Sequence, residues 1–175
     1  LFAFLWPALW AGWGCPAGAW GASPGLRITE GESEWNPSPY LQHWEETRPG
    51  WPSVLPPDSE SGFQNTHSAW VNFGASVPPQ WLRLPVRYTG PAGQPVYLVI
   101  RSFGTNRIDF WATDSAGRTV LHDSLGIDIP YSARTVPNEQ PVFVFRPQPG
   151  QAYTFWVRLY NRAGSLHTGV ALFSQ

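Results

Sequence analysis

From residue 81 to the end of the chain, apolar side chains occupy every second position in a series of short runs. In the first run, Leu82, Leu84 and Val86 would share one face of a strand, because successive side chains of a strand point to opposite sides. Glycine and proline separate the runs, and no long stretch has the period of an amphipathic helix. The pattern predicts an all-β fold, a jelly-roll β-sandwich. The predicted strands cover residues 81–88, 95–101, 107–112, 118–121, 142–145, 153–160 and 169–173.

The composition supports a domain that buries a core. Hydrophobic residues make up 42% of the chain, which is too high a share for a disordered segment. A chain of 175 residues can also bury a core without disulfides. The 19 prolines and 17 glycines suit short strands joined by turns, and the sequence Asp-Ser-Ala-Gly at residues 114–117 predicts a hairpin turn.

The first 25 residues carry no charge and begin with an apolar run. Ala17-Gly18-Ala19 resembles a cleavage site, which predicts a signal peptide over residues 1–19 that has lost its initiating methionine and basic region. Residues 20–25 would then be a short linker, and residues 26–175 the sandwich. Three alternatives stay open: an uncleaved signal anchor, a lipoprotein attached at Cys15, and a buried core helix.

Residues 26–64 are less regular and rich in proline, which excludes a long helix. Residues 26–28 suggest a short strand, and residues 41–47 suggest one or two helical turns. Three tryptophans, Trp35, Trp44 and Trp51, are expected to anchor this segment on the sandwich. The acidic residues of this part are expected to be solvated; they are Glu30, Glu32, Glu34, Glu45, Glu46, Asp58 and Glu60.

Charge and cysteine content limit the partners and the compartment. The net charge is −1 and no basic stripe is present, so we expect no nucleic-acid partner. The one cysteine, Cys15, lies in the leader, so the folded part would have neither a disulfide nor a thiolate metal site. An exported domain without cysteine suits the bacterial periplasm.

The polar positions of the predicted strands suggest a ligand site. Tryptophan stacks on sugar rings or flat ligands, and arginine forms two parallel hydrogen bonds to a carboxylate. We expect one open face to carry the candidate residues on the strands together with Tyr97, and the loop at residues 131–134 to lie at the rim of the sandwich. The candidate ligand-binding residues are Trp81, Arg83, Arg101, Asp109, Trp111, Arg134, Trp156 and Arg158.

Structural roles compete with ligand binding at several of these positions. Arg83 and Arg158 could each pair with one of three acids, and Trp111 and Tyr97 could form a stacking platform or pack against the N-terminal segment. The acids in question are Asp109, Asp123 and Asp128.

Neither a metal site nor an active site is expected. The four histidines have no metal-ligand spacing, and a structural calcium on Asp109, Asp114 or Asp128 is a minor alternative. No cofactor motif, activated nucleophile or convergent acid–base pair is evident, so we expect a protein that is not an enzyme.

Several segments together resemble one known family. They are Asn72-Phe73-Gly74, Trp81-Leu82-Arg83-Leu84, residues 126–134, residues 142–145 and residues 153–159. Over residues 26–175 the chain resembles the type 2 extracellular sensor domain of the 7TMR-DISM receptors, the seven-transmembrane receptors with diverse intracellular signalling modules.

The resemblance implies a jelly roll similar to carbohydrate-binding modules, placed at the periplasmic side of the inner membrane. Seven transmembrane helices and an output such as a histidine kinase or diguanylate cyclase would follow it. It also implies a carbohydrate or another small molecule as ligand.

Two further functions remain open at this point. The chain could be a secreted carbohydrate-binding module outside any receptor, or an envelope assembly protein whose aromatic face binds a protein partner. The gene beyond Gln175 would discriminate, because a receptor continues into apolar segments of about 20 residues each.

Overall fold

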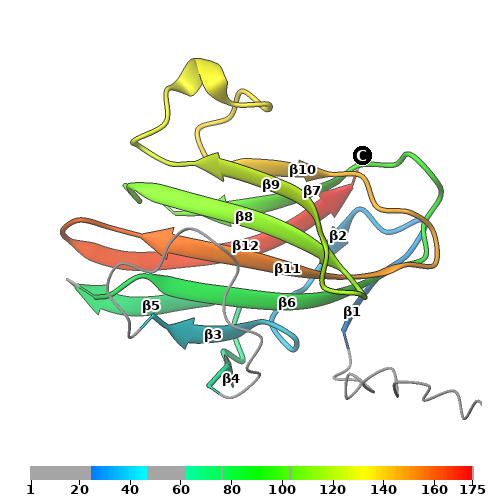
Figure 1. Cartoon of the computed structure of the whole chain (residues 1–175), viewed down its shortest axis with the longest axis horizontal. Coiled ribbons are helices and arrows are strands. Elements are labelled where there is room, and N and C mark those ends of the chain that lie inside the picture. Colours follow the sequence, from blue (N-terminus) through cyan, green and yellow to red (C-terminus); the bar gives the residue numbers. More distant parts are fainter. Residues whose placement is uncertain (1–24, 47–61, 76, 103, 175) are drawn as a thin grey trace, which may run out of the picture.

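The computed structural model describes residues 25–46, 62–75, 77–102 and 104–174, and these form two β-sheets packed face to face (Figure 1). The seven-stranded sheet contains β1 (Leu26–Ile28), β3 (Gln42–Glu45), β4 (Gln64–Asn65), β6 (Gln80–Tyr88), β8 (Arg107–Asp114), β9 (Thr119–Leu125) and β11 (Ala152–Tyr160). The five-stranded sheet contains β2 (Glu34–Trp35), β5 (Trp70–Ala75), β7 (Val96–Arg101), β10 (Val142–Phe145) and β12 (Ser165–Ser174). The prediction of an all-β sandwich is confirmed.

Along the chain, most consecutive strands belong to different sheets; the exceptions are β3 with β4 and β8 with β9, which are neighbours in the larger sheet. The larger sheet has the order β4-β3-β6-β11-β8-β9, with β1 paired in parallel to β6. The smaller sheet has the order β10-β7-β12-β2, with β5 also paired to β12. All pairs other than β1 with β6 are antiparallel. Connections that pass repeatedly from one sheet to the other fit a jelly roll.

The predicted alternation decides which side chains enter the core. On β6, Leu82, Leu84 and Val86 are buried between the sheets, and on β11 Phe155 and Val157 meet them. The intervening residues of these strands point to the outer face of the larger sheet. The periodicity therefore predicted both the strands and their orientation.

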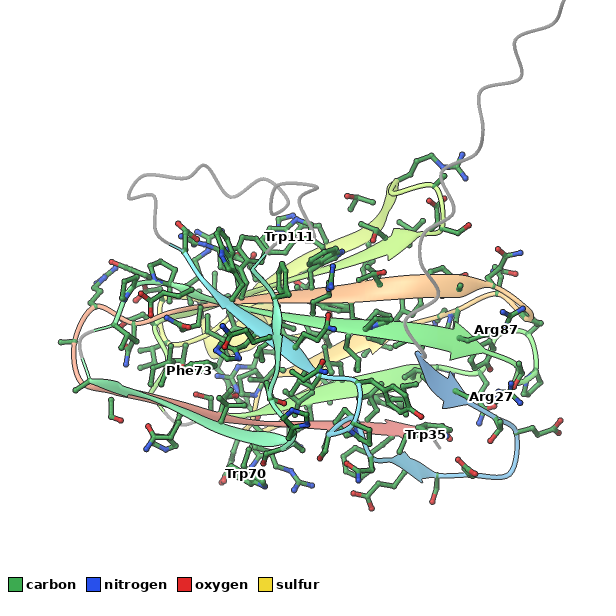
Figure 2. All side chains as sticks on the ribbon, turned by 90° about the horizontal axis from the view of Figure 1, so that it is seen from below. Arg27, Trp35, Trp70, Phe73, Arg87 and Trp111 are labelled. Atoms are coloured by element: carbon green, nitrogen blue, oxygen red, sulfur yellow. The ribbon has the colours of Figure 1, made fainter. Side chains whose placement is uncertain are left out.

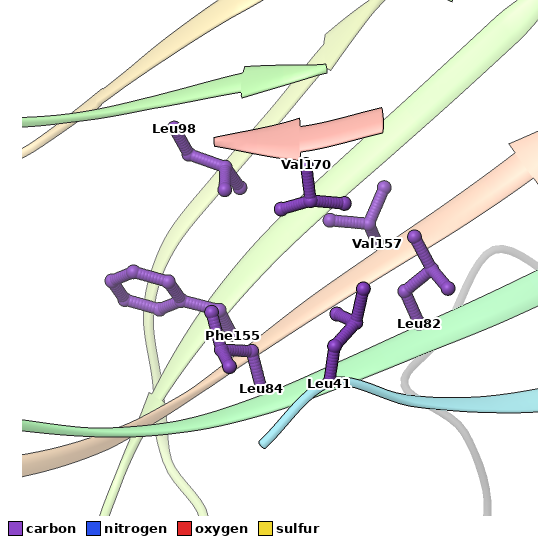
Figure 3. A pocket seen from close by; sticks show the side chains of 7 residues that line it. All are labelled: Leu41, Leu82, Leu84, Leu98, Phe155, Val157 and Val170. Carbon is purple, nitrogen blue, oxygen red and sulfur yellow. The ribbon is translucent and has the colours of Figure 1, made fainter. Parts of the chain in front are cut away.

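A small cavity lies within this core (Figure 3). Its volume is about 10 Å³, close to the minimum for one water molecule, whereas ligand pockets typically span about 300–1,000 Å³. Only apolar side chains line it, so the space between the sheets is not suited to a polar ligand. The lining residues are Leu41, Leu82, Leu84, Leu98, Phe155, Val157 and Val170.

The predicted helical turn at residues 41–47 is wrong. Residues Gln42–Glu45 form β3, which pairs with β6 on one side and with β4 on the other. The hydrogen bonds of a neighbouring strand outweigh the weak local preference of this short segment. Trp35 packs into the core as expected, while Trp51 and the predicted signal peptide lie outside the described residues. Within the described ranges, no helix is long and apolar enough to cross a membrane.

Candidate functional site

Six of the eight candidate residues meet on the outer face of the seven-stranded sheet. The register sets Arg158 of β11 between Trp81 of β6 and Asp109 of β8. Trp156 likewise lies between Arg83 and Trp111. These pairs adjoin because alternate residues of three hydrogen-bonded strands share one face. We call these residues the outer-face cluster: Trp81, Arg83, Asp109, Trp111, Trp156 and Arg158.

A buried ion pair lies at the centre of the outer-face cluster. Arg158 donates from Nε to Glu46 Oε2 at 2.7 Å and from Nη2 to Glu46 Oε1 at 3.1 Å. The indole Nε1 of Trp81 donates to the same Oε2 at 2.9 Å. The side chains of Arg158 and Glu46 are only 13% and 2% exposed, so solvent screens this pair poorly. The carboxylate of Glu46, which directly follows β3, thus bonds to both β6 and β11.

Asp109 adds a second buried carboxylate. Its Oδ1 accepts hydrogen bonds from Arg107 Nε at 2.8 Å and from Ser124 Oγ at 2.6 Å. Its Oδ2 lies 3.9 Å from Arg158 Nη1 and has no hydrogen-bond partner among the described residues. Two arginines therefore face two carboxylates, and the charges at this centre balance.

Aromatic rings stack beside the ion pair. The rings of Trp81 and Trp111 lie 5.3 Å apart, and the exposed ring of His122 lies 4.6 Å from that of Trp111 at an interplanar angle of 5°. The two tryptophans are nearly inaccessible, at 0% and 3% exposure. The expectation of an open face is therefore wrong at these two positions. Figure 2 places Trp111 on the side of the molecule opposite to Trp70.

The half-buried part of the outer-face cluster consists of Arg83 and Trp156, together with the adjoining Gln42, Trp44 and Phe63. The guanidinium carbon of Arg83 lies 4.6 Å from the ring centre of Phe63 and 5.8 Å from that of Trp156, and its Nε donates to Gln42 Oε1 at 2.7 Å. Phe63 also contacts Trp156 edge-on and lies 6.1 Å from Trp44. All five of these residues, Gln42, Trp44, Phe63, Arg83 and Trp156, are partly exposed.

The two remaining candidates lie elsewhere. Arg101 and Tyr97 belong to β7 in the other sheet, so a stacking platform of Tyr97 and Trp111, one of the two alternatives considered for them, does not form. The sequence does not reveal which sheet a strand joins, and this caused the error. Arg134 follows the 3-10 turn η1 (Tyr131–Ala133), in the projecting connection between β9 and β10 (Figure 1). There it donates to the carbonyls of Asn138 and Glu139.

Sequence reasoning missed several members of the site. Glu46 was grouped with the solvated acids, yet it is 3% exposed and pairs with Arg158. His122, Ser124, Phe63 and Gln42 were not singled out either. Three of them, His122, Ser124 and Gln42, lie opposite outer-face residues, and a correct strand register would have distinguished them. Phe63 has no strand partner and gave no such signal.

The three aspartates considered for calcium are separated in the fold. Asp109, Asp114 and Asp128 each pair with a different arginine, and the described part of the chain contains no group of three or more metal-ligating side chains.

Comparison with known families gives one match. The model described as 7TMR-DISM extracellular 2 matches residues 45–174. No curated protein matches the chain.

Proposed function

Because this chain belongs to the 7TMR-DISM extracellular 2 family, we propose that the half-buried part of its outer-face cluster binds a carbohydrate. The family forms the extracellular part of multi-domain transmembrane receptors, and the domain lies on the extracytoplasmic side. Its role in sensing follows from the family. The position and the chemistry of the ligand are our proposal.

The observation that carries the proposal is the combination of rings and polar groups around Arg83. Trp44, Phe63 and Trp156 are each partly exposed, and the C–H face of a sugar ring can stack on aromatic rings of this kind. The guanidinium of Arg83 lies near the rings of Phe63 and Trp156, and the amide oxygen of Gln42 accepts a hydrogen bond from it. Both groups can bond to sugar hydroxyls.

The charge balance favours a neutral ligand over a carboxylate. Both oxygens of Glu46 already accept bonds from Arg158, and Arg107 donates to Asp109. A ligand carboxylate at Arg158 would have to displace Glu46 and leave a buried charge unpaired, which costs several kcal/mol. Arg83 is partly exposed and donates to Gln42, so it is the position at which the experiment distinguishes a carboxylate from a neutral ligand.

The buried ion pair would hold the binding residues in place. On β6, Trp81 is two residues from Arg83, and on β11, Arg158 is two residues from Trp156. Glu46 accepts hydrogen bonds from both Trp81 and Arg158. Side chains locked by such a layer position a site more accurately than loop residues do. A bound ligand would then shift the equilibrium between arrangements of this domain in the receptor.

Calorimetric titration of the 175-residue chain tests this proposal. The panel contains neutral mono- and oligosaccharides, matched uronates and small dicarboxylates. We expect neutral saccharides to bind, and Trp156→Ala and Arg83→Gln each to weaken binding about tenfold. Arg87→Gln is the matched control, because Arg87 is exposed on the same face of β6 outside the cluster.

Three results would overturn the proposal. One is the absence of binding by every neutral saccharide up to about 10 mM. Another is saccharide binding that Trp156→Ala and Arg83→Gln leave unchanged. The third is binding of carboxylates alone with loss in Arg83→Gln, which would assign the site to a small carboxylate instead.

A further inference from the structure

Trp70 is the most exposed tryptophan in the described part of the chain, with 56% of its surface accessible. It is the first residue of β5, and the register of β5 with β12 places it opposite Gly169. Arg101 of β7 lies opposite the same glycine on the other side. The three residues therefore form a row across the outer face of the five-stranded sheet, where Figure 2 shows Trp70 beside β5 and β12.

The indole of Trp70 lies flat on the backbone of Gly169. A Cβ atom placed on Gly169 would be 3.0 Å from each of three ring atoms, Cδ2, Cε2 and Cε3. A ring that met this position edge-on would have these atoms at clearly different distances, so the strand contacts the face of the ring. Gly169 does not have a positive φ, so other residues could adopt its backbone. Space for the ring is therefore the reason for glycine at this position.

The indole is held in place although it is exposed. The backbone N–H of Trp70 donates to Ser68 Oγ at 3.0 Å, and the N–H of Val170 donates to the carbonyl of Ala69 at 2.8 Å. Because one face of the ring lies on the strand, the exposed area belongs to the other face and the edges. A flat ring fixed in this way is suited to stacking on the C–H face of a sugar, since little ordering remains to be done on binding.

Polar side chains adjoin the ring in the next row. Asn72 and His167 lie opposite each other, two residues along from Trp70 and Gly169, and both are exposed. Asn72 Oδ1 accepts a hydrogen bond from the N–H of Gly74 at 3.0 Å, which leaves the amide NH2 group to donate to a ligand. An amide and an imidazole can together bond to the hydroxyls of a sugar ring.

Arg101 adds a positive charge that no neighbouring strand balances. None of β5, β7 and β12 contains an acidic residue, and Arg101 forms no ion pair within the described part of the chain. Its guanidinium carbon lies 5.9 Å from the centre of the Phe173 ring. A guanidinium in such surroundings favours a carboxylate, to which it can form two parallel hydrogen bonds. The other sheet differs, because Arg158 is already paired with Glu46 there.

We infer that Trp70, Asn72, Arg101 and His167 form a second ligand site, which binds a sugar ring that carries a carboxylate. The ring stacks on Trp70, its hydroxyls bond to Asn72 and His167, and its carboxylate bonds to Arg101. Gly169 is a positioning residue, because it acts through the indole. The site does not depend on the proposed carbohydrate site around Arg83, since the two lie on different sheets.

NMR titration of the 175-residue chain with glucuronate tests the inference, with glucose as the neutral probe. The signals to follow are the indole N–H of Trp70, assigned by its loss in Trp70→Phe, and the backbone N–H of Gly169. We expect both to shift with a Kd of about 1 mM for glucuronate, and glucose to bind at these signals at least about tenfold more weakly. Absence of a shift up to about 10 mM glucuronate, or equal affinities for the two sugars, would overturn the inference.

Substitutions separate this site from the rest of the protein. Trp70→Ala should abolish the shift at Gly169, and Arg101→Gln should weaken glucuronate binding about tenfold and bring it to the level of glucose. Tyr131→Ala is the matched control, because Tyr131 is also 56% exposed but lies in the connection between β9 and β10. Trp156→Ala should leave the shift unchanged. A shift that survives Trp70→Ala, or that is lost in Trp156→Ala, would overturn the second site.

Gly169→Val tests whether the flat ring matters. Valine suits a strand, but its side chain would push the indole away from the backbone, so glucuronate should bind about tenfold more weakly although Trp70 is still present. The shift of the Trp70 indole N–H measures this affinity. An unchanged affinity would overturn the role of Gly169. Trp70→Ala removes an exposed side chain and leaves the core intact, so it tests the site independently of how well Gly169→Val folds.

Discussion

Arg158 forms two hydrogen bonds with the carboxylate of Glu46, a residue 112 positions earlier in the chain. Glu46 follows β3 directly, and Arg158 lies within β11, so the pair connects two strands that β6 separates. The indole of Trp81 on β6 bonds to the same carboxylate and completes a polar bridge across the three strands.

Breaking this pair should destabilise the fold strongly. Arg158→Gln and Glu46→Gln should each lower the free energy of unfolding by about 3 kcal/mol, because each leaves a buried charge without its partner. Urea denaturation followed by tryptophan fluorescence measures both. The double variant should cost clearly less than the sum of the two, since the groups interact directly.

An exposed ion pair provides the matched control. Arg162 and Asp128 lie 2.9 Å apart, but their side chains are 67% and 29% exposed. Arg162→Gln should therefore change the free energy of unfolding by less than about 1 kcal/mol. If Arg158→Gln and Arg162→Gln lowered the free energy of unfolding equally, burial would not be the cause of the predicted difference between the two ion pairs.

Gly126 should not tolerate a side chain. Its φ is +130°, and an added Cβ would collide with the carbonyl oxygen of Asn106. Gly126→Ala should cost about 3 kcal/mol through backbone strain and this collision. Gly117→Ala should cost only about 1 kcal/mol, because Gly117 also has a positive φ but has open space around its Cβ position. Thermal unfolding compares them, and equal losses would contradict the collision.

Tyr88 should make stability depend on alkaline pH. Burial, with a smaller effect from Glu30, raises the pKa of its phenol above the ordinary value of 10.0. The unfolded chain then ionises first, so this stability is present below pH 10 and is lost as the pH rises through the folded pKa. The advantage of the original protein over Tyr88→Phe in urea denaturation should shrink above pH 10. An advantage that stays constant with pH would contradict the prediction.

Asp114 should titrate below the ordinary aspartate pKa of 3.8. The side-chain hydrogen bond from Arg118 is the main cause, and backbone N–H groups of Arg118 and Ala116 add to it. Stability from this group is present above the unfolded pKa and is lost as the pH falls through the folded value. Arg118→Gln should move the pKa, followed by carboxyl NMR, toward 3.8. A pKa of Asp114 that is unchanged in Arg118→Gln would contradict the prediction, because the backbone donors alone would then account for the lowered pKa.

The local sequence pattern was enough to predict most strands and the two faces of each strand. The alternation of Leu82, Leu84 and Val86 with Trp81 and Arg83 depends only on the geometry of a single strand, so it is legible in the sequence. The hairpin turn at residues 114–117 is likewise local, and it forms as predicted. The short β3 was mistaken for helix because its pairing with β6, rather than its own residues, makes it a strand.

The register between neighbouring strands decides which side chains meet at the candidate site. Between Ala112 and Thr113 the pairing of β8 with β9 shifts by one residue, and this irregularity brings His122 opposite Trp111. Without the shift His122 would lie opposite Phe110 and face the core, because a one-residue slip exchanges the two faces of a strand. The residues around the turn gave no sequence signal that predicted this shift in register.

The sequence by itself determined the fold class, the core-facing positions and the resemblance to the family, because these follow from short-range periodicity and motif order. Only the tertiary structure decided that Glu46 pairs with Arg158 and that Arg101 and Tyr97 belong to the opposite sheet. Such choices depend on which strands become neighbours across the whole chain. The close packing of the two sheets fixes that arrangement, and no local pattern encodes it.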